Sequence, residues 1–186
     1  MVNNKKLFYL IICSTFIFIF FIVLVCCSSS AGNSESVAFI NLTPPFPDGT
    51  NFVKTSSFGY RIDPIDRLNI SFHSGLDLSA PAGTDIVASG DGEVVETGFQ
   101  ENGFGNFVYL KHDFGGMILF TMYGHMLDDS IVVQVGDKVI QKQKLGTIGS
   151  TGRSTGIHCH FTISVDKLSF KEEDLLDPNI VVEGLK

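Results

Sequence analysis

Four of the five histidines lie in three short segments rich in glycine and polar residues, and this clustering is the most informative feature of the 186-residue sequence. The segments are residues 73–77 (HSGLD), 123–125 (YGH) and 158–160 (HCH). Imidazole nitrogens and carboxylate oxygens bind zinc well, and a catalytic zinc site needs three protein ligands while a fourth position is left to water. Two histidines and one aspartate would meet that need, so these residue types point to metal-assisted hydrolysis.

Backbone geometry explains how such side chains can converge. Side chains alternate between the two faces of a strand, so His158 and His160 point the same way and Cys159 points to the opposite face. We therefore expect Cys159 to be a small buried hydrophobic residue and not a ligand. Gly75 permits the sharp backbone course that would bring His73 and Asp77 to one point.

Residues 73–77, 123–125 and 149–161 (GSTGRSTGIHCHF) resemble, in order, the three signature blocks of the M23 peptidases of lysostaphin/LytM type. The similarity covers roughly residues 52–180 and includes the connecting residues 57–61, 80–84, 88–92 and 135–139. It implies one Zn²⁺ ion held by His73, Asp77 and His160, with His125 and His158 beside it as catalytic residues.

The same resemblance implies a zinc-dependent metallo-endopeptidase that hydrolyses peptide bonds in peptidoglycan stem peptides or cross-links. Zinc would polarise the scissile carbonyl and lower the pKa of its water toward about 7. We expect His158 to act as the base and His125 as a donor to the developing oxyanion, since imidazole titrates near neutrality. Two kinds of scissile bond are compatible with the sequence: a bond between two glycines, or a bond that involves a D-amino acid.

Three residues depart from the usual family pattern without removing a ligand. Ile157 stands where a proline commonly precedes the histidine pair, so the entry into that strand is less rigid. Thr162 stands where an acidic residue often follows, two positions beyond His160 and on the same strand face. Lys142 occupies a turn position where glycine is frequent. If the acidic residue normally orients a site histidine by a hydrogen bond, Thr162 would give that histidine a neutral partner and a different basicity.

Two further features receive non-catalytic interpretations. His112 ends a predicted strand beside Asp113, and we expect a solvated turn residue with no catalytic role. Residues 150–155 are dense in glycine and hydroxyl groups, but the order of glycines and the missing lysine fit no phosphate-binding loop. We expect this loop to let a substrate backbone come close to the metal.

The pattern after residue 51 predicts an all-β, mainly antiparallel domain over residues 52–186. Short apolar runs alternate with Gly and Asp, and the best hairpin joins 107–112 to 117–125 through a turn with two glycines at 115 and 116. Further strands are expected at 84–88, 92–97, 138–140, 144–148 and 158–165. Because the edges of so many short strands must be covered, we expect a compact two-sheet or barrel-like arrangement. The resemblance implies that this is a LytM-type peptidase domain.

The N-terminal part has a different character. Lys5 and Lys6 precede nineteen uncharged residues, 7–25, which is close to the roughly 20 apolar residues needed to cross a membrane as a helix. We expect residues 1–27 to be a signal-anchor or a lipoprotein signal segment with a lipid on Cys27. A Ser-, Asn- and Pro-rich linker, residues 28–51, would then tether an extracytoplasmic domain to the cytoplasmic (or outer) membrane.

The net charge limits the classes of binding partner, and the cysteine content limits the possible disulfides. The chain carries 13 Lys and Arg against 20 Asp and Glu, so its formal net charge is −7. This excludes a broad polyanion-binding surface and makes nucleic acid a poor partner. Beyond residue 27 the only cysteine is Cys159, so no disulfide can form within the domain.

Two alternatives come from other functional classes. A LytM-like regulatory protein would bind the wall or activate amidases without cleaving, but such relatives have usually lost metal ligands, and here all five positions are filled. A biotinyl/lipoyl-type barrel is suggested by residues 90–92 and 136–138. It would need a carrier lysine between matching hairpins and leaves the histidines unexplained.

Overall fold

The computed structural model describes residues 40–64, 67–182, 184 and 185. The predicted membrane or lipoprotein segment and the first half of the predicted linker, residues 28–39, lie outside these residues. Within the described part of the chain, no helix combines the length and apolar character needed to span a membrane.

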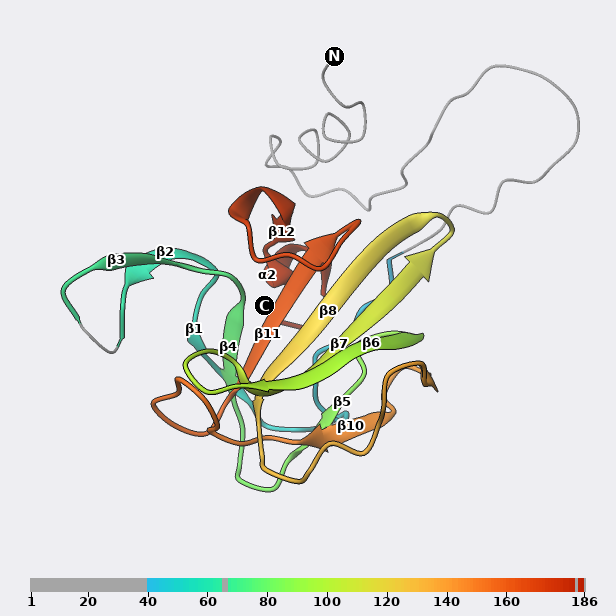
Figure 1. Cartoon of the computed structure of the whole chain (residues 1–186), viewed down its shortest axis with the longest axis horizontal. Helices are drawn as coiled ribbons and strands as arrows, with labels where there is room; N and C mark the ends of the chain where they lie inside the picture. The colour runs from blue at the N-terminus through green and yellow to red at the C-terminus, as the bar shows by residue number, and fades with distance from the viewer. Residues whose placement is uncertain (1–39, 65–66, 183, 186) are drawn as a thin grey trace, which may run out of the picture. The chain divides into compact units, whose positions relative to one another are not determined.

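One eight-stranded antiparallel sheet forms the centre of the domain (Figure 1). The order along it is β1 (Val53–Ser56), β4 (Leu76–Ser79), β11 (Cys159–Val165), β8 (Met117–Met126), β7 (Gly105–Phe114), β6 (Gly92–Gln100) and β9 (Lys138–Val139), with β12 (Leu175–Leu176) paired to β11. Every pairing is antiparallel. The predicted all-β, mainly antiparallel class is confirmed.

Two small sheets and two short helices complete the described part. β5 (Asp85–Val87) pairs with β10 (Lys144–Thr147), and β2 (Gly59–Ile62) pairs with β3 (Ile70–His73). The β2–β3 hairpin extends away from the main sheet in Figure 1. A 3₁₀ turn, η1 (Glu172–Asp174), and a single helical turn, α2 (Pro178–Val181), follow near the C-terminus.

The strands expected from the sequence are present at nearly the expected bounds. The β7–β8 hairpin turns through Gly115 and Gly116, whose φ values of 66° and 94° are those that glycine adopts without strain. The strands β1 to β4 had not been predicted. They are short, and β1 and β2 are largely exposed, so they lack the apolar run on which a strand prediction depends.

The hydrophobic core begins earlier in the chain than the predicted domain boundary at residue 52. Leu42 and Phe46 are each only 1% exposed and belong to the same core cluster as the main sheet. Leu42 also forms a parallel bridge with Val182, next to α2. Leu42 and Phe46, which lie among the prolines of the predicted linker, therefore pack on the domain that follows them.

Candidate active site

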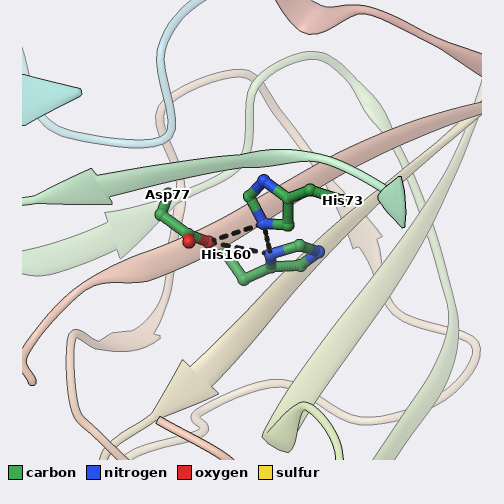
Figure 2. Close-up of side chains that lie close together, drawn as sticks. All are labelled: His73, Asp77 and His160. Carbon is green, nitrogen blue, oxygen red and sulfur yellow. Dashed lines mark hydrogen bonds and ion pairs between the residues drawn. The ribbon is translucent and has the colours of Figure 1, made fainter. Parts of the chain in front are cut away.

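Three side chains from neighbouring strands converge in Figure 2: His73 at the end of β3, Asp77 in β4 and His160 in β11. His160 lies opposite Asp77 in the pairing of β11 with β4, so the register itself brings these two together. Asp77 Oδ1 lies 3.1 Å from His73 Nε2 and 2.9 Å from His160 Nδ1, and the two nitrogens are 3.0 Å apart. The candidate ligand atoms all lie within 4.8 Å of one another.

The second nitrogen of each ring is held by a hydrogen bond outside this cluster. His73 Nδ1 donates to the backbone carbonyl of Ser57 at 2.8 Å. His160 Nε2 faces Thr162 Oγ1 at 3.0 Å and Ser74 Oγ at 3.3 Å. A proton on these outer nitrogens leaves a lone pair on each inner nitrogen, which is the tautomer that a metal ligand requires.

The electrostatics of Asp77 also fit a cation site. Burial alone would raise the pKa of its carboxyl, but the neighbouring imidazoles of His158, His160 and His73 outweigh that effect and hold the pKa well below its usual range. Burial lowers the pKa of His160. A carboxylate and two imidazoles form a donor set that zinc binds, so the residues present fit the metal.

The two remaining histidines lie beside this cluster, with ring centroids 4.6 Å apart. His125 Nδ1 donates to the carbonyl of Thr151 at 2.8 Å, and His158 Nδ1 donates to that of Gly156 at 2.8 Å. His158 Nε2 lies 3.5 Å from Asp77 Oδ1. All five residues singled out from the sequence are thus brought together, two of them outside the metal cluster.

The protonation of these two histidines is biased in opposite directions. Burial, together with the charge of His158, lowers the pKa of His125 to about 4. Burial also disfavours charge on His158, but its contact with Asp77 outweighs this and raises the pKa. The pair therefore contains one ring that stays neutral and one that holds a proton more readily.

A groove of about 280 Å³ opens beside the cluster. Its lining includes all five histidine and aspartate residues of the site together with residues of the β2–β3 hairpin and of two loops. The lining residues are Arg61, Asp63, Pro64, Ser71, Phe72, His73, Ser74, Asp77, Asn102, Gly103, Phe104, His125, Arg153, Ser154, Thr155, His158 and His160. Phe104 stacks on the ring of His160, with centroids 5.1 Å apart. Arg153 Nη2 donates to both carboxylate oxygens of Asp63 at 3.0 Å, which ties the glycine-rich loop to the β2–β3 hairpin. The groove is large enough for a peptide segment.

The glycine-rich loop, residues 149–156, holds His125 through its backbone. A Cβ on Gly152, whose φ is 69°, would lie 2.2 Å from the nitrogen of Gly105. Glycine is thus required where the loop crosses the chain's own β7 strand, which is a different reason from the expected approach of a substrate backbone. Thr151, next to Gly152, supplies the carbonyl that accepts from His125 Nδ1.

The prediction that His112 is solvated is wrong. The side chain is fully buried, Nδ1 donates to the carbonyl of Asp91 at 2.7 Å, and Nε2 lies 2.8 Å from Thr121 Oγ1. Burial lowers the pKa of its imidazole. Strand alternation was the available signal, since His112 follows the buried Leu110 at a spacing of two.

The structure also places Cys159, Lys142 and Thr162, three residues singled out in the sequence. Cys159 is fully buried behind the site, as expected, and burial raises the pKa of its thiol. Lys142 has a φ of 69°, the left-handed conformation for which glycine is usual at such a turn. Thr162 does contact a site histidine, so a hydroxyl group occupies the place expected for an acidic residue.

Sequence reasoning gave no role to several groups that shape the site. The carbonyls of Ser57, Thr151 and Gly156 orient three of the histidines, and backbone carbonyls carry no residue-type signal. Phe104 had no recognisable pattern around it. Arg61 lies in a segment that matched the family, but that match did not indicate what its side chain does.

Comparisons with known proteins agree with this geometry. The model of peptidase family M23 matches residues 71–172. The DD-carboxypeptidase/endopeptidase Mpg of Neisseria meningitidis serogroup B is 38% identical over 112 residues, which is 60% of this chain and 24% of that protein. The chain spans less than a third of the length of the first curated relatives that it matches.

Two solved structures share the fold. The catalytic domain of lysostaphin from Staphylococcus simulans has a TM-score of 0.60 and 31% identity, and the match covers 69% of this chain and 90% of that domain. A zinc-containing peptidase from Vibrio cholerae has a TM-score of 0.60 and 28% identity, with 74% of this chain and 39% of that chain covered.

The family match and the metal-ligand geometry bear on the same residues. His73, Asp77, His125, His158 and His160 all fall within the matched range. The expectation of a zinc cofactor is confirmed by the family, by the zinc-containing structural relative and by the clustered ligand atoms. Because the family model spans more than half of its length, the chain belongs to peptidase family M23.

Proposed function

We propose that the protein is a zinc-dependent endopeptidase that hydrolyses peptide bonds in peptidoglycan stem peptides or cross-links. The observation that carries this proposal is the grouping of His73, Asp77 and His160 within 4.8 Å, with two further histidines beside them on one groove. Support for the substrate comes from relatives, one of which is named a DD-carboxypeptidase/endopeptidase.

We assign the metal ligands as His73 Nε2, Asp77 Oδ1 and His160 Nδ1, since these are the atoms that converge. When bound, zinc supplies a Lewis acid that polarises a carbonyl and makes a water more acidic. The protein's own part is to keep both imidazoles in the ligating tautomer, through Ser57 and Thr162, and to keep Asp77 ionised.

His125 and His158 are assigned the proton transfers. Since Nδ1 of each ring donates to a carbonyl, a neutral ring presents a lone pair at Nε2 and only a protonated ring can donate from Nε2. Hydrolysis needs both: one neutral histidine to take a proton from water and one protonated histidine to stabilise the oxyanion or the leaving amine. The opposite protonation biases favour His125 as the base and His158 as the donor, which is the reverse of the roles expected from the sequence.

The cellular setting is also part of the proposal. The basic residues Lys5 and Lys6 followed by the apolar stretch 7–25 support export of the domain and its attachment to the bacterial membrane, by an anchor helix or by a lipid on Cys27. The substrate would then be the wall close to that membrane.

The test is mass spectrometry of purified sacculi digested with the protein, with a His125→Ala variant in parallel. The expected result is a set of new amine termini within stem peptides that appears with the zinc-loaded protein, disappears with a chelator and is absent from the variant. Zinc-loaded protein that releases no new amine termini would leave a non-cleaving, regulatory function in place of this one.

A further inference from the structure

Arg61 projects from β2 into the groove next to the metal cluster. It pairs across the hairpin with Ser71, and both residues line the groove. Its side chain is a quarter exposed, and Nη2 lies 3.7 Å from Asp77 Oδ2. That oxygen is the outer one, because Oδ1 of Asp77 is the atom that contacts the histidines.

The guanidinium of Arg61 has more donors than partners. Its Nε is buried and has no hydrogen-bond partner among the described residues, and the 3.7 Å contact with Asp77 is too long for a hydrogen bond. Arg153, across the same groove, instead gives Asp63 two hydrogen bonds of 3.0 Å. Burying a charged group whose N–H donors lack partners costs free energy, unless a ligand accepts hydrogen bonds from those donors.

The charges along the groove favour an anionic ligand. Two arginines, Arg61 and Arg153, face two aspartates, Asp63 and Asp77, so the four charges cancel. A bound divalent cation therefore leaves the groove positive, although the whole chain carries −7. Planar guanidinium groups match carboxylates in geometry and bind them with two parallel hydrogen bonds.

We propose that Arg61 binds a free carboxylate of the substrate, carried by the residue on the amine side of the scissile bond. This rests on the proposed peptidase function and specifies its substrate. Because Nη2 of Arg61 lies 3.7 Å from Oδ2 of Asp77, the guanidinium stands directly beside the metal site, within reach of a substrate residue next to the scissile bond. A bond between two D-residues at a stem terminus or cross-link offers such a carboxylate, whereas a bond inside an oligoglycine bridge does not.

The test compares two peptides that end in D-Ala-D-Ala and differ only in a C-terminal carboxylate or carboxamide. The zinc-loaded protein should cleave the carboxylate peptide with a kcat/KM at least about tenfold higher, as expected for one charge-assisted pair, and it should cleave pentaglycine poorly. Arg61→Gln should remove the preference, mainly through a higher KM, and Arg61→Lys should keep part of it.

The matched control is Arg67→Gln, since Arg67 is an exposed arginine of the same hairpin that does not line the groove. This variant should retain the full carboxylate preference. Equal cleavage of the two peptides by the wild-type protein, or a preference that survives in Arg61→Gln, would overturn the assignment. Loss of bound zinc in Arg61→Gln would do so too, because Arg61 would then act by holding Asp77.

A binding measurement separates this idea from the proposed function. The carboxylate and carboxamide peptides are titrated calorimetrically into zinc-loaded His125→Ala protein, in which turnover is blocked, with and without Arg61→Gln. Tighter binding of the carboxylate form that depends on Arg61 supports the assignment even if sacculi are not cleaved. Equal affinities contradict it even if sacculi are cleaved.

Discussion

Thr162 Oγ1 lies 3.0 Å from His160 Nε2, on the side of the ring opposite to Nδ1, which faces Asp77. Thr162 and His160 are neighbours on one face of β11, and both are almost completely buried. The hydroxyl group therefore fixes the orientation and tautomer of a histidine that we assign as a metal ligand. It does so without adding the negative charge that an acidic residue at this position would bring.

Thr162→Val should weaken zinc binding by about tenfold, because it keeps the shape of the side chain and removes the acceptor for His160 Nε2–H. Zinc affinity is measured by competition with a chromogenic chelator, and Co²⁺ absorption reports the ligand geometry. Thr162→Ser should retain the affinity. Ser164→Ala, a buried hydroxyl of the same strand that bonds Lys167 instead, should leave it unchanged. An unaltered affinity in Thr162→Val would show that Ser74 alone orients the ring.

Removal of zinc should lower the thermal stability of the protein. The ligand atoms are gathered by residues from β3, β4 and β11, and a metal that binds only the folded chain adds about 2.7 kcal/mol at a concentration one hundred times its Kd. At about 2–4 °C per kcal/mol for a chain of this size, the Tm should fall by roughly 5–10 °C when a chelator is added.

The control for zinc removal is Asp77→Asn, which replaces the charged ligand by a neutral amide of the same shape. Its Tm, followed by calorimetry, should respond little to chelator or to added zinc. A wild-type Tm that changed equally little with chelator and with added zinc would contradict the assignment of the metal site.

The grouping of His73, Asp77 and His160 was predictable from the sequence, because its signal lies in residue types and short spacings. Strand alternation placed His158 and His160 on one face. Gly75 serves for another reason than the sharp backbone course expected of it, since a Cβ there would lie 2.3 Å from the carbonyl oxygen of Phe161. The β7–β8 hairpin was likewise visible, since two glycines separate two long apolar runs.

The groups that orient the histidines were not predictable, for a physical reason. The carbonyl of Thr151 reaches His125 only because a loop folds back across β7. Such contacts depend on tertiary geometry and leave no trace in residue type. The burial of Leu42 was missed for a similar reason, because its partner Val182 lies 140 positions away in the chain.

Buried His112 should make the protein sensitive to mild acid. Burial lowers the pKa of this imidazole in the folded state, so the unfolded chain takes up a proton first, near its ordinary pKa of about 6.5. Stability from this group is complete above pH 6.5 and falls as the pH drops below it, by up to about 1.4 kcal/mol per pH unit until the folded pKa is reached.

The measurement for His112 is urea denaturation between pH 7.5 and 5 with a chelator present, which removes the pH dependence of zinc binding. His112→Asn keeps a donor for the carbonyl of Asp91 and should unfold more easily at pH 7.5, but with a shallower decline toward pH 5. The other four histidines are common to both proteins, so the difference in slope isolates His112. Parallel curves would mean that His112 does not titrate differently on unfolding.

Gly152→Ala should impair catalysis through His125, although Gly152 touches no histidine itself. An added Cβ would lie 2.2 Å from the nitrogen of Gly105, and the φ of 69° is unfavourable for alanine, so the loop must move. Because the neighbouring Thr151 holds His125 Nδ1, that movement displaces the ring. We expect a loss of about 1–3 kcal/mol in stability and at least a tenfold loss of kcat on peptide substrates with zinc still bound.

Gly156 offers the matched control in the same loop. Its added Cβ would meet nothing within 4 Å and its φ is not in the left-handed region, so Gly156→Ala should retain both stability and rate. Zinc content should be unchanged in both variants, since none of the three ligands contacts Thr151. If Gly152→Ala reduced the zinc content together with kcat, the loop would be supporting the metal cluster directly and the route through Thr151 and His125 would be wrong.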